Sequence, residues 1–231
     1  VCHQGRASTN SVYASVYGKE DDAVSGDLGF INVHYAASAA TLMGVTAQGG
    51  YQYEGKTYAE RFAHVPPLNT CTGCHNPHST EVALDSCTTC HARIEDFAAI
   101  RMSRTDFDGD GDVREGIADP IADLHARLGQ AILTYATEIA DAPVVYAPGS
   151  YPYFFADTNA DGAVSEGEAA YPNRYQSWTP RMLKAAYNYQ YVAKDGGAAM
   201  HNPHYVLQLL YDSLDSLSEQ IDVDMEGLVR P

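Results

Sequence analysis

Two short stretches of the chain carry a pair of cysteines and a histidine at the same spacing: residues 71–75 read CTGCH and residues 87–91 read CTTCH. Two thiols separated by two residues can each add across a vinyl group of one haem, and the histidine that follows can bind the iron. The spacing therefore predicts two covalent haems, one held by Cys71, Cys74 and His75 and the other by Cys87, Cys90 and His91.

A zinc ribbon is the main alternative for the same cysteines. The two pairs are separated by 12 residues, and four thiolates in such pairs can bind zinc tetrahedrally. Zinc ribbons, however, usually have a longer gap between their pairs. A histidine follows both pairs, although histidine accounts for only 9 of the 231 residues. The two histidines therefore favour haem over zinc.

A partial third motif opens the chain. Cys2 is followed directly by His3, which matches the last two residues of a haem motif. We interpret this pair as the end of a third motif whose first cysteine lies upstream, so that the chain is a fragment or a processed part of a larger protein. A haem held by a single thioether is the alternative. Disulfides would leave one of the five cysteines unpaired.

Six histidines lie outside the three motifs and could bind the far side of an iron. His34 lies among apolar residues, where a buried imidazole needs a polar partner that an iron would supply. His78 is too close to His75 to reach the same iron, but it can reach a neighbouring haem. His125 fits a core position better, because it lies on an apolar helix stripe. The predicted distal candidates are His34, His64, His78, His201 and His204, with one of the last two contacting a propionate.

Residues 157–168 match a twelve-residue calcium loop. Such loops carry oxygen donors at positions one, three, five, seven and twelve and a glycine at position six. The predicted ligands are Asp157, Asn159, Asp161, the carbonyl of Ala163, and Glu168. Two prolines precede this loop, so we expect a fixed structural ion rather than a calcium switch.

A second acidic loop repeats the first half of this pattern. Its predicted ligands are Asp106, Asp108, Asp110 and Asp112. Position twelve is Ile117, so Glu115 or Asp119 would have to supply the last carboxylate. Carboxylates that alternate along one loop repel each other unless a cation lies between them. The sequence therefore predicts one complete calcium site and a second, incomplete one.

The elements that must position these groups are mainly α-helices with long loops. Apolar residues recur at helical spacing from residue 119 to 140. Thr179-Pro180 and Asn202-Pro203 each place a capping side chain before a proline at the first helical position. Residues 28–44 read as an apolar helix that ends at a glycine. The strand signal is limited to short pieces such as residues 144–146.

The cysteines divide the chain into two parts. All five lie within residues 1–100, and residues 101–231 contain none. We predict a haem-attaching region at 1–100 and a helical capping region at 101–231, which contains both acidic loops. The two regions are expected to form one compact unit, a multihaem cytochrome c architecture organised around covalently bound haems.

Charge and hydropathy exclude several classes of partner. The formal net charge of −16 argues against nucleic acid, whose binding depends on clusters of lysine and arginine. The same charge suits cationic redox partners, metal ions or minerals. No apolar stretch reaches the roughly 18 residues of a membrane span. Haem of this type is attached outside the cytoplasmic membrane, so we expect a periplasmic, cell-surface or extracellular location.

The motifs resemble those of the multihaem c-type cytochromes. The resemblance rests on the doubled haem motif, on the run CHNPH at residues 74–78 and on HNP at residues 201–203. His201 and the helix after it are also similar to the late distal ligand of the nitrite reductase and hydroxylamine oxidoreductase group. These matches cover residues 64–91 and 200–211, so they imply a cofactor and its ligation but no substrate. No Cys-x-x-Cys-Lys motif is present.

The function expected from these residues is extracytoplasmic electron transfer through bis-histidine haems, as a carrier rather than a catalyst. Redox proteins, other cytochrome subunits and extracellular metal or mineral acceptors are the expected partners. One alternative is an oxidoreductase that reduces a small nitrogen or sulfur oxyanion at an open haem, with a surplus histidine or Arg101, Arg104 or Arg181 as proton donor or anion clamp. Another is a calcium-stabilised subunit of a larger cytochrome complex or filament.

Overall fold

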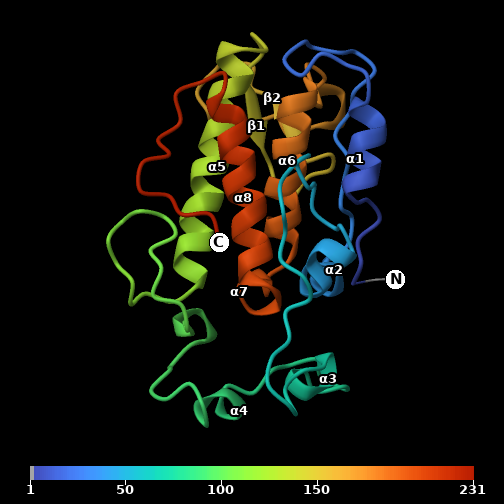
Figure 1. The fold of residues 1–231 in the computed structure, drawn as a ribbon. Coiled ribbons are helices and arrows are strands. Elements are labelled where there is room, and N and C mark those ends of the chain that lie inside the picture. Colours follow the sequence, from blue (N-terminus) through green and yellow to red (C-terminus); the bar gives the residue numbers. More distant parts are fainter. Residues whose placement is uncertain (1–2) are drawn as a thin grey trace.

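Three long helices form the centre of the molecule. The computed structural model describes residues 3–231, and in it α5 (Ala118–Glu138), α6 (Pro180–Lys194) and α8 (Pro203–Ser218) pack against one another (Figure 1). Helix α5 buries its apolar stripe, including Leu124, Leu128 and Ile132, as its helical periodicity predicted.

Two of these helices begin at the residues that the sequence indicated. The Thr179 hydroxyl accepts a hydrogen bond from the backbone N–H of Met182 at 3.2 Å, and the Asn202 side chain accepts one from Tyr205 at 3.2 Å. In each helix a proline follows the capping residue, where its missing N–H costs no helical hydrogen bond. The predicted helix starts are therefore confirmed.

The amino-terminal part adds short helices and long coils to the bundle. Its elements are α1 (Thr9–Val16), α2 (Ser38–Met43) and the 3-10 turn η1 (Gly44–Thr46). The helix predicted for residues 28–44 is wrong before Ser38. The backbone N–H of Val33 donates to the Gln190 side chain at 3.1 Å, and His34 has a left-handed φ of 73°. These tertiary and backbone constraints exclude a helix there.

The remaining elements are small. Strands β1 (Val144–Tyr146) and β2 (Phe154–Ala156) pair antiparallel, with Val144 opposite Ala156, which confirms the predicted strand. One-turn helices lie at α3 (Cys71–Cys74), α4 (Asp85–Thr88) and α7 (Ala198–His201), and 3-10 turns at η2 (Phe97–Ala99) and η3 (Tyr171–Asn173). The expected class, mainly helical with long loops, is confirmed.

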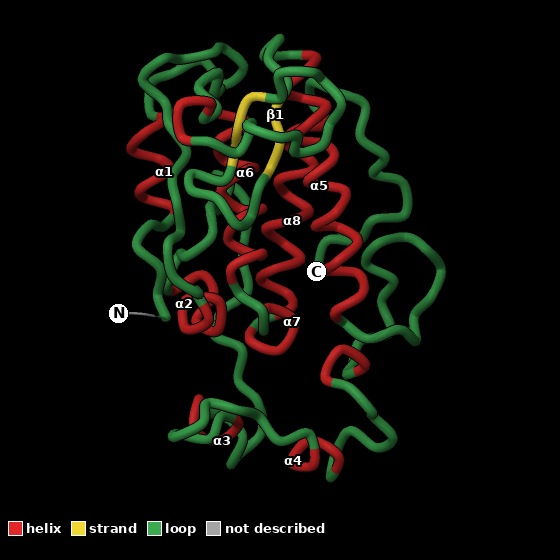
Figure 2. The backbone as a smooth tube through the Cα atoms, turned by 180° about the vertical axis from the view of Figure 1, so that it is seen from behind, coloured by secondary structure: helices red, strands yellow, loops and turns green. Residues whose placement is uncertain are grey.

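Buried residues are unevenly distributed along the chain. One core cluster joins the amino-terminal residues Val12 and Val33 to Trp178 and the three long helices. Between Tyr58 and Phe107, all of them described positions, no residue is buried. Figures 1 and 2 show this stretch, with α3 and α4, set apart beyond the α2 and α7 end of the bundle. We call residues 59–106 the haem segment. Among the described residues, no helix is both long and apolar enough to cross a membrane.

Candidate haem-binding site

Both complete Cys-x-x-Cys-His motifs fold into the same turn. The backbone N–H of His75 donates to the Cys71 carbonyl at 2.7 Å, and that of His91 donates to the Cys87 carbonyl at 2.9 Å. The Thr70 hydroxyl caps the first turn by accepting from Gly73 at 3.1 Å. The local sequence thus brings two thiols and an imidazole close together in each motif, as attachment of one haem by both cysteines requires.

The ring of His75 is oriented by a backbone carbonyl. Its Nδ1 lies 2.8 Å from the carbonyl oxygen of Thr80. A carbonyl can only accept a hydrogen bond, so Nδ1 carries the proton and the Nε2 lone pair is left for a metal. Metal-binding histidines commonly have this second hydrogen bond, which fixes their tautomer and ring orientation. His75 therefore fits the role of an iron ligand.

His201, which lies 126 positions later in the chain, is oriented in the same manner by a carboxylate. Its Nδ1 lies 2.8 and 3.0 Å from the two carboxylate oxygens of Asp195, which leaves Nε2 for a metal. Asp195 is only 3% exposed and also accepts hydrogen bonds from the Ser38 hydroxyl and the Gly197 N–H, both at 3.2 Å. Burial alone would raise the pKa of Asp195, but its contacts with His201 outweigh burial and lower it.

The structure places four histidines in two facing pairs. The ring centroids of His75 and His201 are 6.4 Å apart, and those of His64 and His91 are 6.2 Å apart. Two imidazoles on opposite sides of one metal ion, each with a metal–nitrogen bond of about 2 Å, have centroids roughly 6 Å apart. His64 Nδ1 is also buried without a hydrogen-bond partner, as expected for a nitrogen that binds something else. The donor sets fit two bis-histidine haems.

The other candidate histidines have different surroundings. His34 is exposed, so the expectation that it is a buried imidazole is wrong. His78 is exposed beside Asn76, which accepts its backbone N–H at 2.9 Å, and the exposed ring of His204 lies 6.0 Å from that of Phe107. His3 is exposed, and its carbonyl accepts from the first turn of α2. Cys2 lies outside the described residues.

His125 is a satisfied core residue. It stacks on the Tyr189 ring at 4.0 Å, and its Nε2 lies 2.9 Å from the Tyr189 carbonyl. Burial lowers the pKa of His125, and the hydrogen bond with the Tyr189 backbone opposes this shift in part. Its position agrees with the structural role predicted from its helix stripe.

The four described cysteines are free thiols that do not form a zinc site. Among residues 3–231, no group of three or more histidines and cysteines comes within ligand reach of one point. Burial raises the pKa of Cys74, and the neighbouring thiols of Cys87 and Cys71 raise it further. The two motifs are therefore close in space, but they are not arranged as a tetrahedral thiolate quartet.

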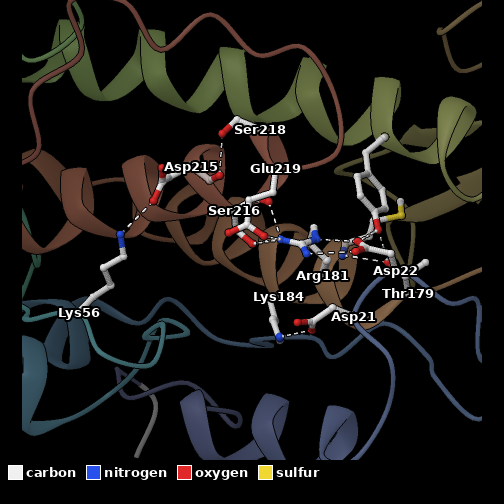
Figure 3. Close-up of polar contacts among 12 residues, drawn as sticks. Asp21, Asp22, Lys56, Thr179, Arg181, Lys184, Asp215, Ser216, Ser218 and Glu219 are labelled. Carbon is white, nitrogen blue, oxygen red and sulfur yellow. Dashed lines mark hydrogen bonds and ion pairs between the residues drawn. The ribbon is translucent and has the colours of Figure 1, made fainter.

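Two arginines considered as anion clamps are already paired. Arg181 contacts Asp22 at 2.6 Å and Glu219 at 2.7 Å, and Figure 3 shows its guanidinium among these carboxylates and Ser216. Arg101 pairs with Glu115 at 3.1 Å and donates to the Ser103 carbonyl. Arg104 is exposed. Neither paired guanidinium is available to hold an oxyanion.

Both acidic loops fold with the same internal hydrogen bond. The position-one carboxylate accepts from the glycine N–H at position six, Asp157 from Gly162 and Asp106 from Gly111, each at 2.8 Å. Glu168 accepts from Thr158 and Ser165, so it closes its loop. In the second loop, the side-chain amide of Asn159 donates to the Asp161 carboxylate at 2.8 Å, and the Ala163 N–H also donates to Asp161. In the first loop, the Asp112 N–H donates to Asp110.

The described part of the chain contains one carboxylate cluster of the kind that holds a metal. Oxygens of Asp106, Asp108 and Asp110 all lie within 4.8 Å of one another. Glu115 is held by Arg101 and Asp119 accepts from Gly116 at 3.2 Å, so neither carboxylate is free of other contacts. Ile117, at position twelve, belongs to the hydrophobic core.

Sequence reasoning missed two groups that orient the histidines. Asp195 and the Thr80 carbonyl stand outside every motif, and their role depends on side-chain and backbone contacts. The short spacing from Asp195 through two glycines to His201 was the only available signal. It was too weak to interpret alone.

Comparisons with known proteins give relatives of one kind. The chain is 29% identical to the C-type polyheme cytochrome OmcB of Geobacter sulfurreducens, over 95% of this chain and 30% of that protein. It is 28% identical to the C-type polyheme cytochrome OmcC of the same species, with the same coverage. The chain thus spans 30% of the length of these relatives. No protein-family model matches it, and no solved structure gives a significant match.

Proposed function

We propose that this chain, a multihaem c-type cytochrome by its motifs and its relatives, transfers electrons between redox partners through haems that lie close together. The observation that carries the proposal is the facing of His75 with His201 and of His64 with His91. A haem iron supplies one-electron redox chemistry. Histidine on both faces keeps the iron six-coordinate in both redox states, which favours electron transfer over substrate binding.

In this proposal each haem joins distant parts of the chain. Cys71 and Cys74 attach the first haem, His75 binds its iron, and His201 reaches the same iron from α7. Cys87 and Cys90 attach the second, His91 binds its iron, and His64 binds the opposite face. The first haem thereby ties the haem segment to the bundle, whereas both ligands of the second lie within the segment.

Closeness of the haems follows from closeness of the motifs. Twelve residues separate Cys74 from Cys87, and the charge of Cys87 helps to raise the pKa of Cys74. The haems attached there would lie side by side, so an electron can pass between them within one chain. We assign the predicted third haem to Cys2 and His3. His34 is a candidate for its far side, because residue 6 hydrogen-bonds to Val33.

The surface and the relatives indicate the kind of partner. The net charge of −16 favours cationic redox proteins, metal ions or mineral surfaces as electron donors or acceptors. Other cytochrome subunits are a further class. Because haem of this type is attached outside the cytoplasmic membrane, the proposed location is the periplasm, the cell surface or the outside of the cell. Reduction of a small oxyanion is less favoured, because Arg101 and Arg181 are engaged in ion pairs.

Optical spectroscopy of the holoprotein tests the proposal. We expect low-spin spectra, two or three haems per chain and no binding of carbon monoxide. His201→Ala should open one iron and produce a fraction of haem that binds carbon monoxide, whereas His204→Ala, the matched variant on the neighbouring helix, should not. Carbon monoxide binding by the unmodified protein, or an unchanged spectrum in His201→Ala, would contradict the proposed ligation.

A further inference from the structure

We propose that the two acidic loops, residues 106–117 and 157–168, each bind a calcium ion, and that the ion in the first loop fixes the returning end of the haem segment to the bundle. The binding itself is independent of electron transfer. Only the role of the first ion rests on the proposed function, because that role concerns the segment that is proposed to hold the haems.

Unsatisfied buried carboxylates are the primary evidence. Asp108 is only 3% exposed and Asp157 only 7%, and in each the Oδ1 atom is buried without a hydrogen-bond partner. A buried carboxylate oxygen with no donor is costly, and such groups are normally paired or bound to a metal. The same defect occurs once in each loop. A cation held by each loop would satisfy both oxygens.

The loops also share the backbone arrangement of a calcium loop. Gly111 and Gly162, at position six, have φ values of 89° and 75°, which L side chains rarely adopt. At position five, Asp110 and Asp161 accept the N–H of position seven at 2.7 and 2.8 Å. In the first loop, oxygens of Asp106, Asp108 and Asp110 lie within 4.8 Å of one another, and carboxylate and carbonyl donors suit calcium.

The two sites differ at position twelve, and this difference predicts their relative affinity. Glu168 is 4% exposed and belongs to its loop through contacts with Thr158 and Ser165, so it can supply two oxygens. The first loop has Ile117 there, and Glu115 is held by Arg101. Because Glu168 completes the second loop with a bidentate carboxylate at position twelve and the first loop has no carboxylate there, we expect the second loop to bind calcium more tightly.

The first loop lies where three parts of the molecule meet. Ile117 donates its backbone N–H to the carbonyl of Ile100 at 3.0 Å, and Val229 donates to Phe107 at 3.1 Å. Arg127 on α5 donates to the Asp108 carbonyl at 3.0 Å. An ion bound by Asp106, Asp108 and Asp110 would therefore hold together the end of the haem segment, the start of α5 and the carboxy-terminal segment around Val229.

Calorimetric titration of the chelator-treated holoprotein with calcium chloride tests the binding. We expect two equivalents, one tight and one weaker, and loss of one equivalent in Asp108→Asn and of the other in Asp157→Asn. Asp222→Asn, which removes the same charge at an exposed site outside both loops, should retain both. Should a buried variant fail to fold, Asp110→Asn and Asp161→Asn test the same sites at exposed ligands.

No calcium binding by the unmodified protein, or two equivalents in every loop variant, would overturn the proposal. Equal affinity for magnesium chloride would overturn the assignment to calcium. Hydrogen exchange measured with and without calcium tests the role: residues 95–117 should exchange at least several-fold faster after chelation, and equally fast in both conditions in Asp110→Asn. Because titration and exchange do not depend on the spin state of iron, failure of the proposed electron transfer would leave these results interpretable.

Discussion

The bundle and the haem segment differ in what holds them together. Leu124, Leu128 and Trp178 in the bundle are fully buried, and one continuous core includes residues from both ends of the chain. In the 48 residues of the segment, none is buried. Apolar burial is the dominant source of stability in a protein of this size, so the segment needs another source. In our proposal, covalent thioethers and bonds between histidines and iron hold the segment in place.

This contrast shows which sequence features specify the structure of each region. The bundle can be understood from periodic apolar residues and capped helices, as for any helical protein. The segment has only motifs, prolines and short turns. The pairing of His75 with His201 is one of the places where the two regions meet, so a change in one region should affect the other there.

The largest expected effect is on the bundle core. Leu128→Ala should reduce the free energy of unfolding by about 3 kcal/mol, because Leu128 is completely buried and its truncation leaves a cavity. The matched variant Leu84→Ala, half-buried in the segment, should cost less than about 1 kcal/mol. Guanidinium unfolding followed by circular dichroism measures both. Equal costs would abolish the distinction between the two regions.

A smaller effect is expected at the ion pairs of the bundle. Burial alone would raise the pKa of Asp22, but hydrogen bonds from Arg181 and Tyr135 outweigh it and lower the pKa. The pair therefore stabilises the fold above the unfolded pKa of about 4, and this contribution is lost as the pH falls through the folded pKa. Asp22→Asn should cost about 1–2 kcal/mol at pH 7, and the cost should disappear in acid.

The control for Asp22 is the exposed pair of Lys19 and Asp27, in which Lys19 Nζ lies 3.5 Å from Asp27 Oδ2. Asp27→Asn should change stability by less than about 0.5 kcal/mol at any pH, because exposed ion pairs contribute little. Urea unfolding at pH 3 and pH 7 distinguishes the two variants. A cost of Asp22→Asn that was no smaller at pH 3 than at pH 7 would show that packing, not the ion pair, is responsible.

The smallest effect should appear where the two regions meet. Asp195→Asn removes a negative charge from the hydrogen bond to His201, which makes the imidazole a weaker donor to ferric iron. The reduction potential of that haem should rise by on the order of 50 mV, which corresponds to a roughly tenfold change for a one-electron couple. Ser38→Ala, which removes only a neutral hydrogen bond to Asp195, should give a smaller shift. Redox titration followed optically decides between a tuned ligand and a merely structural contact.

Local features of the fold were predictable from the sequence, and features that depend on distant contacts were not. The helix starts at Thr179 and Asn202 were correct, because a capping side chain and a proline act within one turn. The helix expected from residue 28 was wrong, because Gln190 of α6 binds the backbone of Val33 instead. The chain's own apolar pattern carries no information about a hydrogen bond formed with a residue 157 positions away.

By itself, the sequence determined three features of this protein: the thiols and histidines proposed to hold haem, the oxygen-rich loops, and the three helices of the bundle. Each of these depends on residues within about a dozen positions of one another, so their spacing alone is informative. Only the tertiary structure decided that His201 faces His75 and that Asp195 orients it. Residues that far apart in the chain meet through the packing of α7 and α8 beside the haem segment, and no local spacing encodes such a meeting.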